Sequence, residues 1–512
     1  MPAKWLKDAV FYEIYPQSFK DTNADGIGDL QGIIEKLDYV NSLGCNALWI
    51  NPCFDSPFRD AGYDVRDYRK VASRYGTNAD LIRLFDEAHK RDMRVLLDLV
   101  PGHTSEQHAW FRASQSEDQP NPYTNRYIWT DQWFAGCDLN FIAGEAERPN
   151  AYIVNFFKCQ PALNYGFLKP RAPWQLPMDH PDCIATREAM KDVMRFWLSQ
   201  GCDGFRVDMA ASLVKYDDDQ KSGTCAIWRE VRGMLDAEFP EAALVAEWSR
   251  PDLSLPAGFD MDFILNDPHT NYATLLRDYN APVDNTYFRR DAPARDARRF
   301  LDIYLPWYEA TRGVGYISLP TCNHDTPRPR WHLTETELKL AYAFLFTMPG
   351  VPFLYYGDEI GMRYRILPTK EGGYQRTGSR TPMQWDDTAN LGFSEADPQV
   401  LYLPVDPADD APTVAAQERD PHSLLRFVRA LLALRHGEPD LQADAPFELL
   451  CADPDRPLIY RRGGLLLAIN PSGEALSAEA PIEGRKPLFT FGDATLDGGR
   501  LTLDAQSFVI LK

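Results

Sequence analysis

Three short stretches, Gly204-Phe205-Arg206-Val207-Asp208, Leu244-Val245-Ala246-Glu247 and Thr321-Cys322-Asn323-His324-Asp325, decide the fold, because each ends a short apolar segment on a carboxylate. Such a segment predicts a buried strand, and an ionised group at its tip is tolerated only where the strand emerges into a polar cleft. Carboxylates gathered in one cleft repel each other, so one can keep its proton while another stays ionised. That division of roles is typical of enzymes that cleave glycosidic bonds.

Outward from these stretches, short β-branched or aromatic runs alternate with amphipathic segments, which predicts repeated strand–helix units around a parallel sheet. Eight runs are expected to be strands: Val10–Tyr15, Ala47–Asn51, Arg94–Val100, Gly204–Asp208, Leu244–Glu247, Met261–Leu265, Gly315–Leu319 and Val351–Tyr356. Helical periodicity predicts helices over Leu30–Ser42, Asn78–Arg91, Ile184–Gln200, Cys225–Glu238 and Glu335–Phe346. Eight such units predict an α/β fold, the (β/α)8 TIM barrel, whose functional residues lie at the C-terminal strand ends.

The barrel pattern is interrupted after the third strand and ends before the C-terminus. Residues 102–174 have many aromatic and turn residues but little helical period, which predicts an inserted domain B. After a last helix at Ser423–Arg435, residues 437–512 contain short strands separated by Gly, Pro and Asp, which predicts a C-terminal antiparallel β-sandwich domain. The barrel is then expected to comprise residues 1–101 and 175–436.

The composition narrows the class of partner. The 512 residues include 54 basic and 74 acidic side chains, and the resulting net charge of −20 disfavours nucleic acids and anionic membranes. No apolar run is long enough to span a bilayer, and the polar start is unlike a secretion signal. The nine cysteines, Cys137 among them, are scattered without a CxxC pair, so neither a disulfide framework nor a zinc site is predicted. We therefore expect a cytoplasmic monomer or homo-oligomer with reduced thiols that acts on a small neutral or cationic substrate.

Four motifs occur in one order along the chain, each on a predicted barrel strand. They are Asp98-Leu99-Val100-Pro101-Gly102-His103-Thr104-Ser105, Gly204-Phe205-Arg206-Val207-Asp208, Ala246-Glu247-Trp248 and Asn323-His324-Asp325. With them the chain resembles the α-amylase superfamily, glycoside hydrolase family 13, over nearly its whole length. The segment Arg380-Thr381-Pro382-Met383-Gln384-Trp385 is similar to the branch that contains oligo-1,6-glucosidase, α-glucosidase and trehalose synthase.

The resemblance implies a role for each of the three acids. Asp208 matches the nucleophile, Glu247 the acid/base and Asp325 a third carboxylate that binds sugar hydroxyls. The family mechanism is retaining, with nucleophile and acid/base about 5 Å apart. Arg206 projects to the same side of its strand as Asp208 and is expected to keep it ionised. Glu247 has an alanine and a tryptophan as neighbours, so we expect apolar surroundings that raise its pKa.

Other residues match positions that bind the sugar in the family. His103 and His324 correspond to residues that bind hydroxyls in the first subsite and stabilise transition-state charge. In related exo-acting enzymes, a tyrosine in the position of Tyr63 provides a stacking platform. The following acid, Asp64 here, pairs with an arginine in the position of Arg380. Such a pair closes the cleft beyond one sugar and favours release of single glucosyl units.

A loop near the N-terminus has the ligand spacing of a calcium site. Oxygen ligands stand at loop positions 1, 3, 5, 7 and 9, with glycine at position 6 and a backbone carbonyl as the ligand at position 7. They are Asp21, Asn23, Asp25, Ile27 and Asp29. The twelfth position is Gly32 rather than a bidentate glutamate, so a structural Ca²⁺ or Mg²⁺ is expected, as related glucosidases carry.

These features favour an exo-acting α-glucosidase that hydrolyses malto- or isomalto-oligosaccharides, sucrose or trehalose. A transglycosylating relative, such as trehalose synthase or another glucosyltransferase or isomerase, shares the same catalytic residues and stays an alternative. An endo-acting α-amylase would require an open cleft, and a non-catalytic scaffold would commonly lack the acids and carry a membrane helix. Ala162, Met209 and Trp248-Ser249-Arg250 depart from the usual glucosidase residues, so linkage and leaving-group preference stay open.

Overall fold

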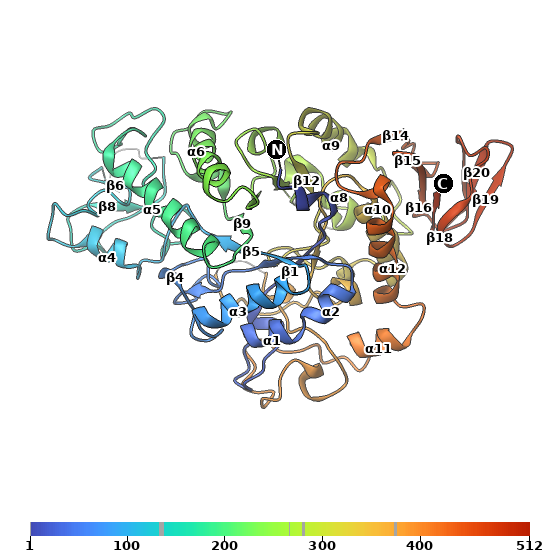
Figure 1. Cartoon of the computed structure of the whole chain (residues 1–512), viewed down its shortest axis with the longest axis horizontal. Helices are drawn as coiled ribbons and strands as arrows, with labels where there is room; N and C mark the ends of the chain where they lie inside the picture. Colours follow the sequence, from blue (N-terminus) through green and yellow to red (C-terminus); the bar gives the residue numbers. More distant parts are fainter. Residues whose placement is uncertain (1, 133–137, 266, 279–281, 373–375) are drawn as a thin grey trace.

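The computed structural model describes residues 2–132, 138–265, 267–278, 282–372 and 376–512, so Cys137 lies outside the described residues (Figure 1). All eight predicted barrel strands are present; seven are shorter than predicted at one or both ends, and the fifth begins and ends one residue earlier than predicted. They are β1 Phe11–Ile14, β2 Ala47–Ile50, β5 Arg94–Leu99, β9 Gly204–Val207, β10 Ala243–Ala246, β11 Met261–Phe263, β12 Tyr316–Ser318 and β13 Phe353–Tyr355.

These strands form one parallel sheet in the order β12-β11-β10-β9-β5-β2-β1-β13. A parallel bridge between Pro320 and Phe353 joins its two ends, and the Thr321 N–H donates to the Phe353 carbonyl at 2.9 Å. Nearly every strand residue is buried, as expected for strands covered by helices on the outside and packed side chains inside. The predicted TIM barrel is therefore confirmed.

The helices lie outside the sheet and follow the predicted order. Around the barrel they are α1 Leu30–Glu35, α2 Leu37–Ser42, α3 Asn78–His89, α5 Pro181–Leu198, α6 Ser222–Glu238, α7 Pro251–Ser254, α8 Ala273–Leu276, α9 Arg298–Thr311, α10 Glu335–Thr347, α11 Val414–Arg419 and α12 Leu424–Gly437. Capping boxes at Thr77 and Thr334 start α3 and α10. The single helix predicted over Leu30–Ser42 is wrong, because the chain leaves helical geometry at Lys36, whose ammonium lies 4.3 Å from the Trp385 ring centre. No helix in the described part of the chain is long and apolar enough to cross a membrane.

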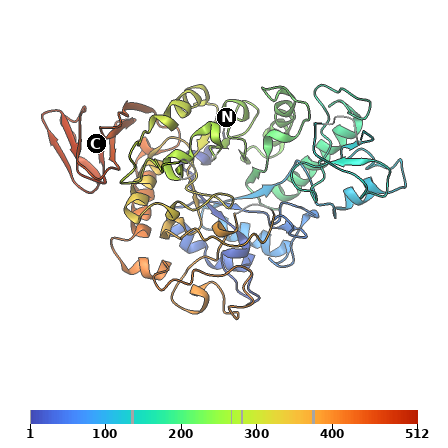
Figure 2. The same cartoon turned by 180° about the vertical axis from the view of Figure 1, so that it is seen from behind.

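Two further groups of strands lie at opposite ends of the molecule (Figure 1, Figure 2). Between β5 and β9 the chain forms helix α4 Ala109–Gln115 and a small sheet of β6 Trp129–Thr130, β8 Ala151–Ile153 and β7 Phe141–Ile142. The short hairpin of β3 Phe54–Asp55 with β4 Asp67–Val71 lies on the same side of the barrel, where β4 contacts α3 and α5 (Figure 1). The C-terminal strands are β14 Phe447–Cys451, β15 Leu458–Arg462, β16 Leu465–Asn470, β17 Leu476–Glu479, β18 Pro487–Phe491, β19 Ala494–Asp497, β20 Arg500–Leu503 and β21 Ser507–Leu511. They form the expected antiparallel sheets, β14-β15-β16-β21-β18 and β17-β20-β19.

A layer of aromatic rings fills the barrel beneath its C-terminal mouth. Trp49, Phe263 and Phe353 are at most 1% exposed, and Phe11 stacks on Phe353 with ring centres 4.3 Å apart. The Arg206 guanidinium lies 5.1 Å from the centre of the Trp49 ring. This aromatic floor therefore separates the charged groups of the mouth from the opposite end of the barrel.

Candidate active site

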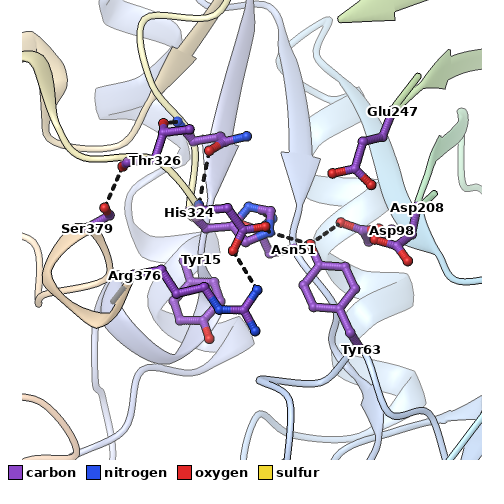
Figure 3. Close-up of polar contacts among 12 residues, drawn as sticks. Tyr15, Asn51, Tyr63, Asp98, Asp208, Glu247, His324, Thr326, Arg376 and Ser379 are labelled. Atoms are coloured by element: carbon purple, nitrogen blue, oxygen red, sulfur yellow. Dashed lines mark hydrogen bonds and ion pairs between the residues drawn. The ribbon is translucent and has the colours of Figure 1, made fainter. Parts of the chain in front are cut away.

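The three acids predicted to act together line one cavity of about 300 Å³ at the mouth of the barrel. Asp208 directly follows β9, Glu247 directly follows β10, and Asp325 lies in the segment after β12. In Figure 3, Asp208, Glu247 and Asp98 lie on one side of Tyr63, and His324 and Arg376 lie on the other. The lining comprises Asp60, Tyr63, His103, Phe156, Asp208, Met209, Ala211, Ser212, Glu247, Trp248, Leu265, Asp267, Asp325 and Arg376. A cavity of this size is at the lower end of the range for small-molecule sites.

Arg206 joins the two acids at the centre of this cavity. Its Nη1 lies 3.1 Å from Asp208 Oδ1, and its Nη2 lies 2.8 Å from Glu247 Oε1. The same Nη1 lies 2.8 Å from Asp98 Oδ1. One planar guanidinium can bridge two carboxylates only when they are close together, and a separation of about 5 Å is the arrangement of retaining glycosidases. The predicted contact between Arg206 and Asp208 is therefore present.

The two bridged carboxyls influence each other's protonation. Burial and the nearby Glu247 charge raise the pKa of Asp208 well above its ordinary value, and Arg206 opposes this rise. The pair therefore retains a proton over a pH range in which an isolated aspartate is ionised. The expected apolar surroundings of Glu247 are wrong, because Arg206 contacts its Oε1 and the Met209 N–H donates to its Oε2 at 2.8 Å.

On the opposite side, Asp325 contacts two arginines and one histidine. Its Oδ1 accepts from Arg376 at 2.8 Å and from Arg380 at 2.7 Å, and its Oδ2 lies 3.1 Å from His324 Nε2. Although burial would raise it, these partners hold the pKa of Asp325 well below its usual range. Tyr63 connects the two sides, because its hydroxyl lies 2.6 Å from His324 Nε2 and donates to Asp98 Oδ2 at 3.1 Å.

The predicted pair of Asp64 and Arg380 does not form. Asp64 is fully buried in a turn, where its carboxylate accepts the N–H groups of Arg59 and Asp60 and the hydroxyl of Ser56. Because the turn uses this carboxylate, the acid that reaches the cavity is Asp60, four residues earlier. Asp60 forms an ion pair with Arg376, and both line the cavity. The pair of an acid and an arginine that closes the cleft, here called the clamp, is therefore formed by Asp60 and Arg376 instead of Asp64 and Arg380.

His103 also lines the cavity, but both of its ring nitrogens have protein partners. Nε2 lies 3.1 Å from the Tyr63 carbonyl and Nδ1 lies 3.2 Å from the Asn155 amide nitrogen. Burial lowers the pKa of His103 to about 4, so the ring is neutral at pH 7. The Asn155 carbonyl oxygen accepts from Lys215 at 2.9 Å. A hydroxyl-binding role for His103 stays a prediction.

The wall next to Glu247 is the side on which a leaving group or acceptor would lie. It is formed by Phe156, Met209, Trp248, Leu265 and Asp267. Met209 has a left-handed backbone, with φ 43°, and this conformation turns its N–H toward Glu247. Phe156 is 40% exposed and lines the cavity.

The proposed metal loop lies apart from the cavity and is held by its own side chains. Asp21 accepts the N–H groups of Ala24 and Gly26 and the Ser394 hydroxyl, and Asp29 caps α1 through the Gly32 N–H. These oxygen donors are of the type that Ca²⁺ takes. Within the described ranges, however, no three acidic, histidine or cysteine side chains converge closely enough to hold an ion. The metal site stays a prediction.

Several residues of the site were not predicted from the sequence: Glu13, Asp60, Asp98, Phe156 and Arg376. Asp98 belongs to one of the four family motifs and lies near the C-terminal end of a predicted strand, and this position could have indicated that it is a site residue. Arg376 is close in sequence to Arg380, but sequence spacing in a turn does not determine which arginine reaches the cavity. Tyr165 of domain B is buried, and its hydroxyl donates to the Pro101 carbonyl at 2.8 Å.

Comparison with known proteins agrees with this geometry. Residues 13–444 match the family described as alpha amylase, catalytic domain. The chain belongs to the α-amylase family. It is an enzyme of the glycoside hydrolase and transglycosylase class, built on the barrel of that family.

Relatives within the α-amylase family are named both as glucosidases and as synthases. Trehalose synthase/amylase TreS of Mycobacterium tuberculosis is 34% identical over 501 residues, which cover 88% of this chain and 78% of the relative. An oligo-1,6-glucosidase of Heyndrickxia coagulans is 32% identical, with 95% of each chain covered. A variant of isomaltulose synthase from Erwinia rhapontici NX5, solved with its natural substrate sucrose, has a TM-score of 0.82, 28% identity and 99% coverage of both chains.

Proposed function

We propose that this enzyme is a retaining, exo-acting α-glucosidase that acts on short α-glucosides through a covalent glucosyl-enzyme. The observation that carries the proposal is the bridging of Asp208 and Glu247 by Arg206, at the base of a cavity closed on one side by the Asp60–Arg376 pair. The first feature supports the retaining mechanism, and the second supports a site that holds a single terminal glucosyl unit.

In the first step, the Asp208 carboxylate attacks the anomeric carbon while Glu247 donates its proton to the glycosidic oxygen. The bond from the anomeric carbon to that oxygen breaks, and an ester between glucose and Asp208 forms. In the second step, Glu247 removes a proton from water, which attacks the anomeric carbon and releases Asp208. Asp325 accepts hydrogen bonds from ring hydroxyls, and its low pKa keeps it ionised for that role.

A second candidate is transfer of the glucosyl unit to another sugar, including rearrangement of a disaccharide. The aromatic wall of Phe156 and Trp248 beside Glu247 favours it, because a sugar retained there would compete with water. The relatives named as trehalose synthase and isomaltulose synthase also favour it. Time courses on maltose, isomaltose, sucrose and trehalose separate the candidates. Free glucose as the main product supports hydrolysis, and new disaccharides with little free glucose support transfer.

Breaking the clamp tests the exo-acting part of the proposal. Asp60→Asn removes one charge of the buried pair with Arg376, and we expect kcat/KM on disaccharides to fall about 10- to 100-fold. The matched control is Asp64→Asn, which removes the carboxylate originally predicted for this role. It is expected to lower the melting temperature and to leave disaccharide kinetics nearly unchanged. A fall in kcat/KM in Asp64→Asn without a fall in Asp60→Asn would contradict the assignment of Asp60 to the clamp.

Chelation tests the proposed structural Ca²⁺ or Mg²⁺ at the loop of Asp21, Asn23, Asp25, Ile27 and Asp29. We expect metal analysis to find about one ion per chain and chelation to lower the melting temperature, because an ion that binds only the folded state stabilises it. Asp25→Ala should give the same lower melting temperature without chelator. A protein that contains no metal, or that melts identically with and without chelator, would remove the metal from the proposal.

A further inference from the structure

Glu13 is a fully buried carboxyl inside the barrel, directly beneath the residues that surround the sugar. It lies on β1, in register with Trp49 of β2 and Tyr355 of β13. Its Oε1 is 2.9 Å from His324 Nδ1. A buried acid at the centre of a strand is costly unless it has a charged partner. The geometry makes His324 that partner.

His324 lies between two carboxylates. Nδ1 faces Glu13, and Nε2 faces Asp325 Oδ2 at 3.1 Å and the Tyr63 hydroxyl at 2.6 Å. A neutral imidazole has one N–H, so two ionised carboxylates on its two nitrogens require the doubly protonated ring. The ring is also held parallel to Tyr63, with centres 5.4 Å apart, and to Tyr15 at 6.3 Å. The Asn51 side chain forms a hydrogen bond with the Glu13 carboxyl, and this bond lowers the pKa of Glu13.

We propose that Glu13 is a positioning residue that keeps His324 protonated on both ring nitrogens and so fixes Asp325 for sugar binding. The kinetic consequence rests on the proposed function, whereas the protonation of His324 does not. The imidazolium would then donate a hydrogen bond from Nδ1–H to Glu13 and from Nε2–H toward Asp325 and the sugar hydroxyls.

The other charged and titratable groups around the Glu13–His324 pair come from several elements. They are Tyr15, Tyr63, Asp98, Arg206, Asp325, Tyr355, Arg376 and Arg380. Burial disfavours the imidazolium, but Asp325 and Glu13 raise the pKa of His324 above its ordinary value. Burial raises the pKa of Glu13, and His324 opposes that rise. The ion pair is therefore complete only at a pH above the pKa of Glu13 and below the pKa of His324, and it is lost as the pH rises through the latter.

The test is Glu13→Gln, which keeps the size and hydrogen-bonding capacity of the side chain and removes its charge. Loss of an opposite charge at this distance is expected to lower the pKa of His324 by about one to three units. Titration of ¹⁵N-histidine-labelled enzyme by NMR, with His324 assigned from a His324→Asn variant, measures this shift directly. The alkaline limb of kcat/KM should move to lower pH by the same amount.

Glu359→Gln is the matched control. Glu359 is equally buried and accepts the hydroxyls of Tyr12 and Tyr39, each at 2.7 Å, without contacting His324. Burial raises the pKa of Glu359 to about 7, so the same change is made in a comparable environment. We expect its His324 titration and its pH profile to match those of the unmodified enzyme.

A third variant, Glu13→Asp, keeps the charge and should recover most of the His324 pKa even if Glu13→Gln folds poorly. The proposal is overturned if His324 is neutral at pH 7 in the unmodified enzyme, with the proton on Glu13, or if its titration is unchanged in Glu13→Gln. If the enzyme acts on no α-glucoside, the proposed function fails, and the NMR titration still decides the role of Glu13.

Discussion

Replacing Asp208 by asparagine is expected to lower kcat on every α-glucoside that the enzyme accepts by about 10⁴-fold or more. The amide cannot form the ester with the anomeric carbon, and no other carboxylate is placed to substitute. Asp98 also contacts Arg206, but it lies deeper, with its Oδ2 bonded to Trp49 and Tyr63. Initial rates on a disaccharide, with intact thermal unfolding, measure the effect.

Asp203→Asn provides the control on the same segment of chain. Asp203 lies at the opposite end of β9, where its carboxylate contacts His89 and Arg94. Its replacement is expected to change stability and to leave kcat within a few-fold of the unmodified value. Retention of full activity in Asp208→Asn would show that the nucleophile has been assigned to the wrong residue.

Replacing Glu247 by glutamine is expected to have an effect that depends on the leaving group. An amide cannot protonate the glycosidic oxygen, so hydrolysis of maltose or sucrose should fall by about 10²- to 10⁴-fold. An aryl glucoside whose phenolate leaves without a proton should still form the glucosyl-enzyme in a burst. Breakdown of that intermediate should be slow, because water then has no base.

Mass spectrometry of the intact protein should therefore detect the glucosyl adduct in Glu247→Gln and not in Asp208→Asn. Glu241→Gln, before the other end of β10, is the control and is expected to behave as the unmodified enzyme. Equal losses on alkyl and aryl glucosides in Glu247→Gln would speak against an acid role for this residue.

The barrel was predictable because each strand is a short apolar run and each run is separated from the next by a helical period. The position of the acids followed from the same reasoning, since a charge can end such a run only at the mouth. Glu13 and Asp98 were harder to predict as site residues. Their burial is compensated by His324 and Arg206, which are distant in sequence.

The clamp shows a second reason why a site residue could not be predicted from the sequence. Asp60 and Asp64 are separated by one turn, and either could have faced the cavity. The turn is closed by main-chain N–H groups that need an acceptor, and Asp64 supplies it. Hydrogen bonds of this kind depend on the backbone geometry of the turn, which the residue types alone do not predict. The break between α1 and α2 is similar, because Lys36 leaves the helix where it meets Trp385 from a distant part of the chain.

The aromatic floor lies at the lower end of the catalytic cavity, which opens at the mouth of the barrel. Trp49, Phe263 and Phe353 are buried inside the barrel below the cavity, so we expect water to reach the anomeric carbon from the mouth. A departing sugar and the incoming water must then use the same side, and the sugar that is still leaving shields the ester from solvent. The ratio of rearranged to hydrolysed product would then follow the residence time of the first leaving sugar, and mutations that widen the outer wall should shift it toward hydrolysis.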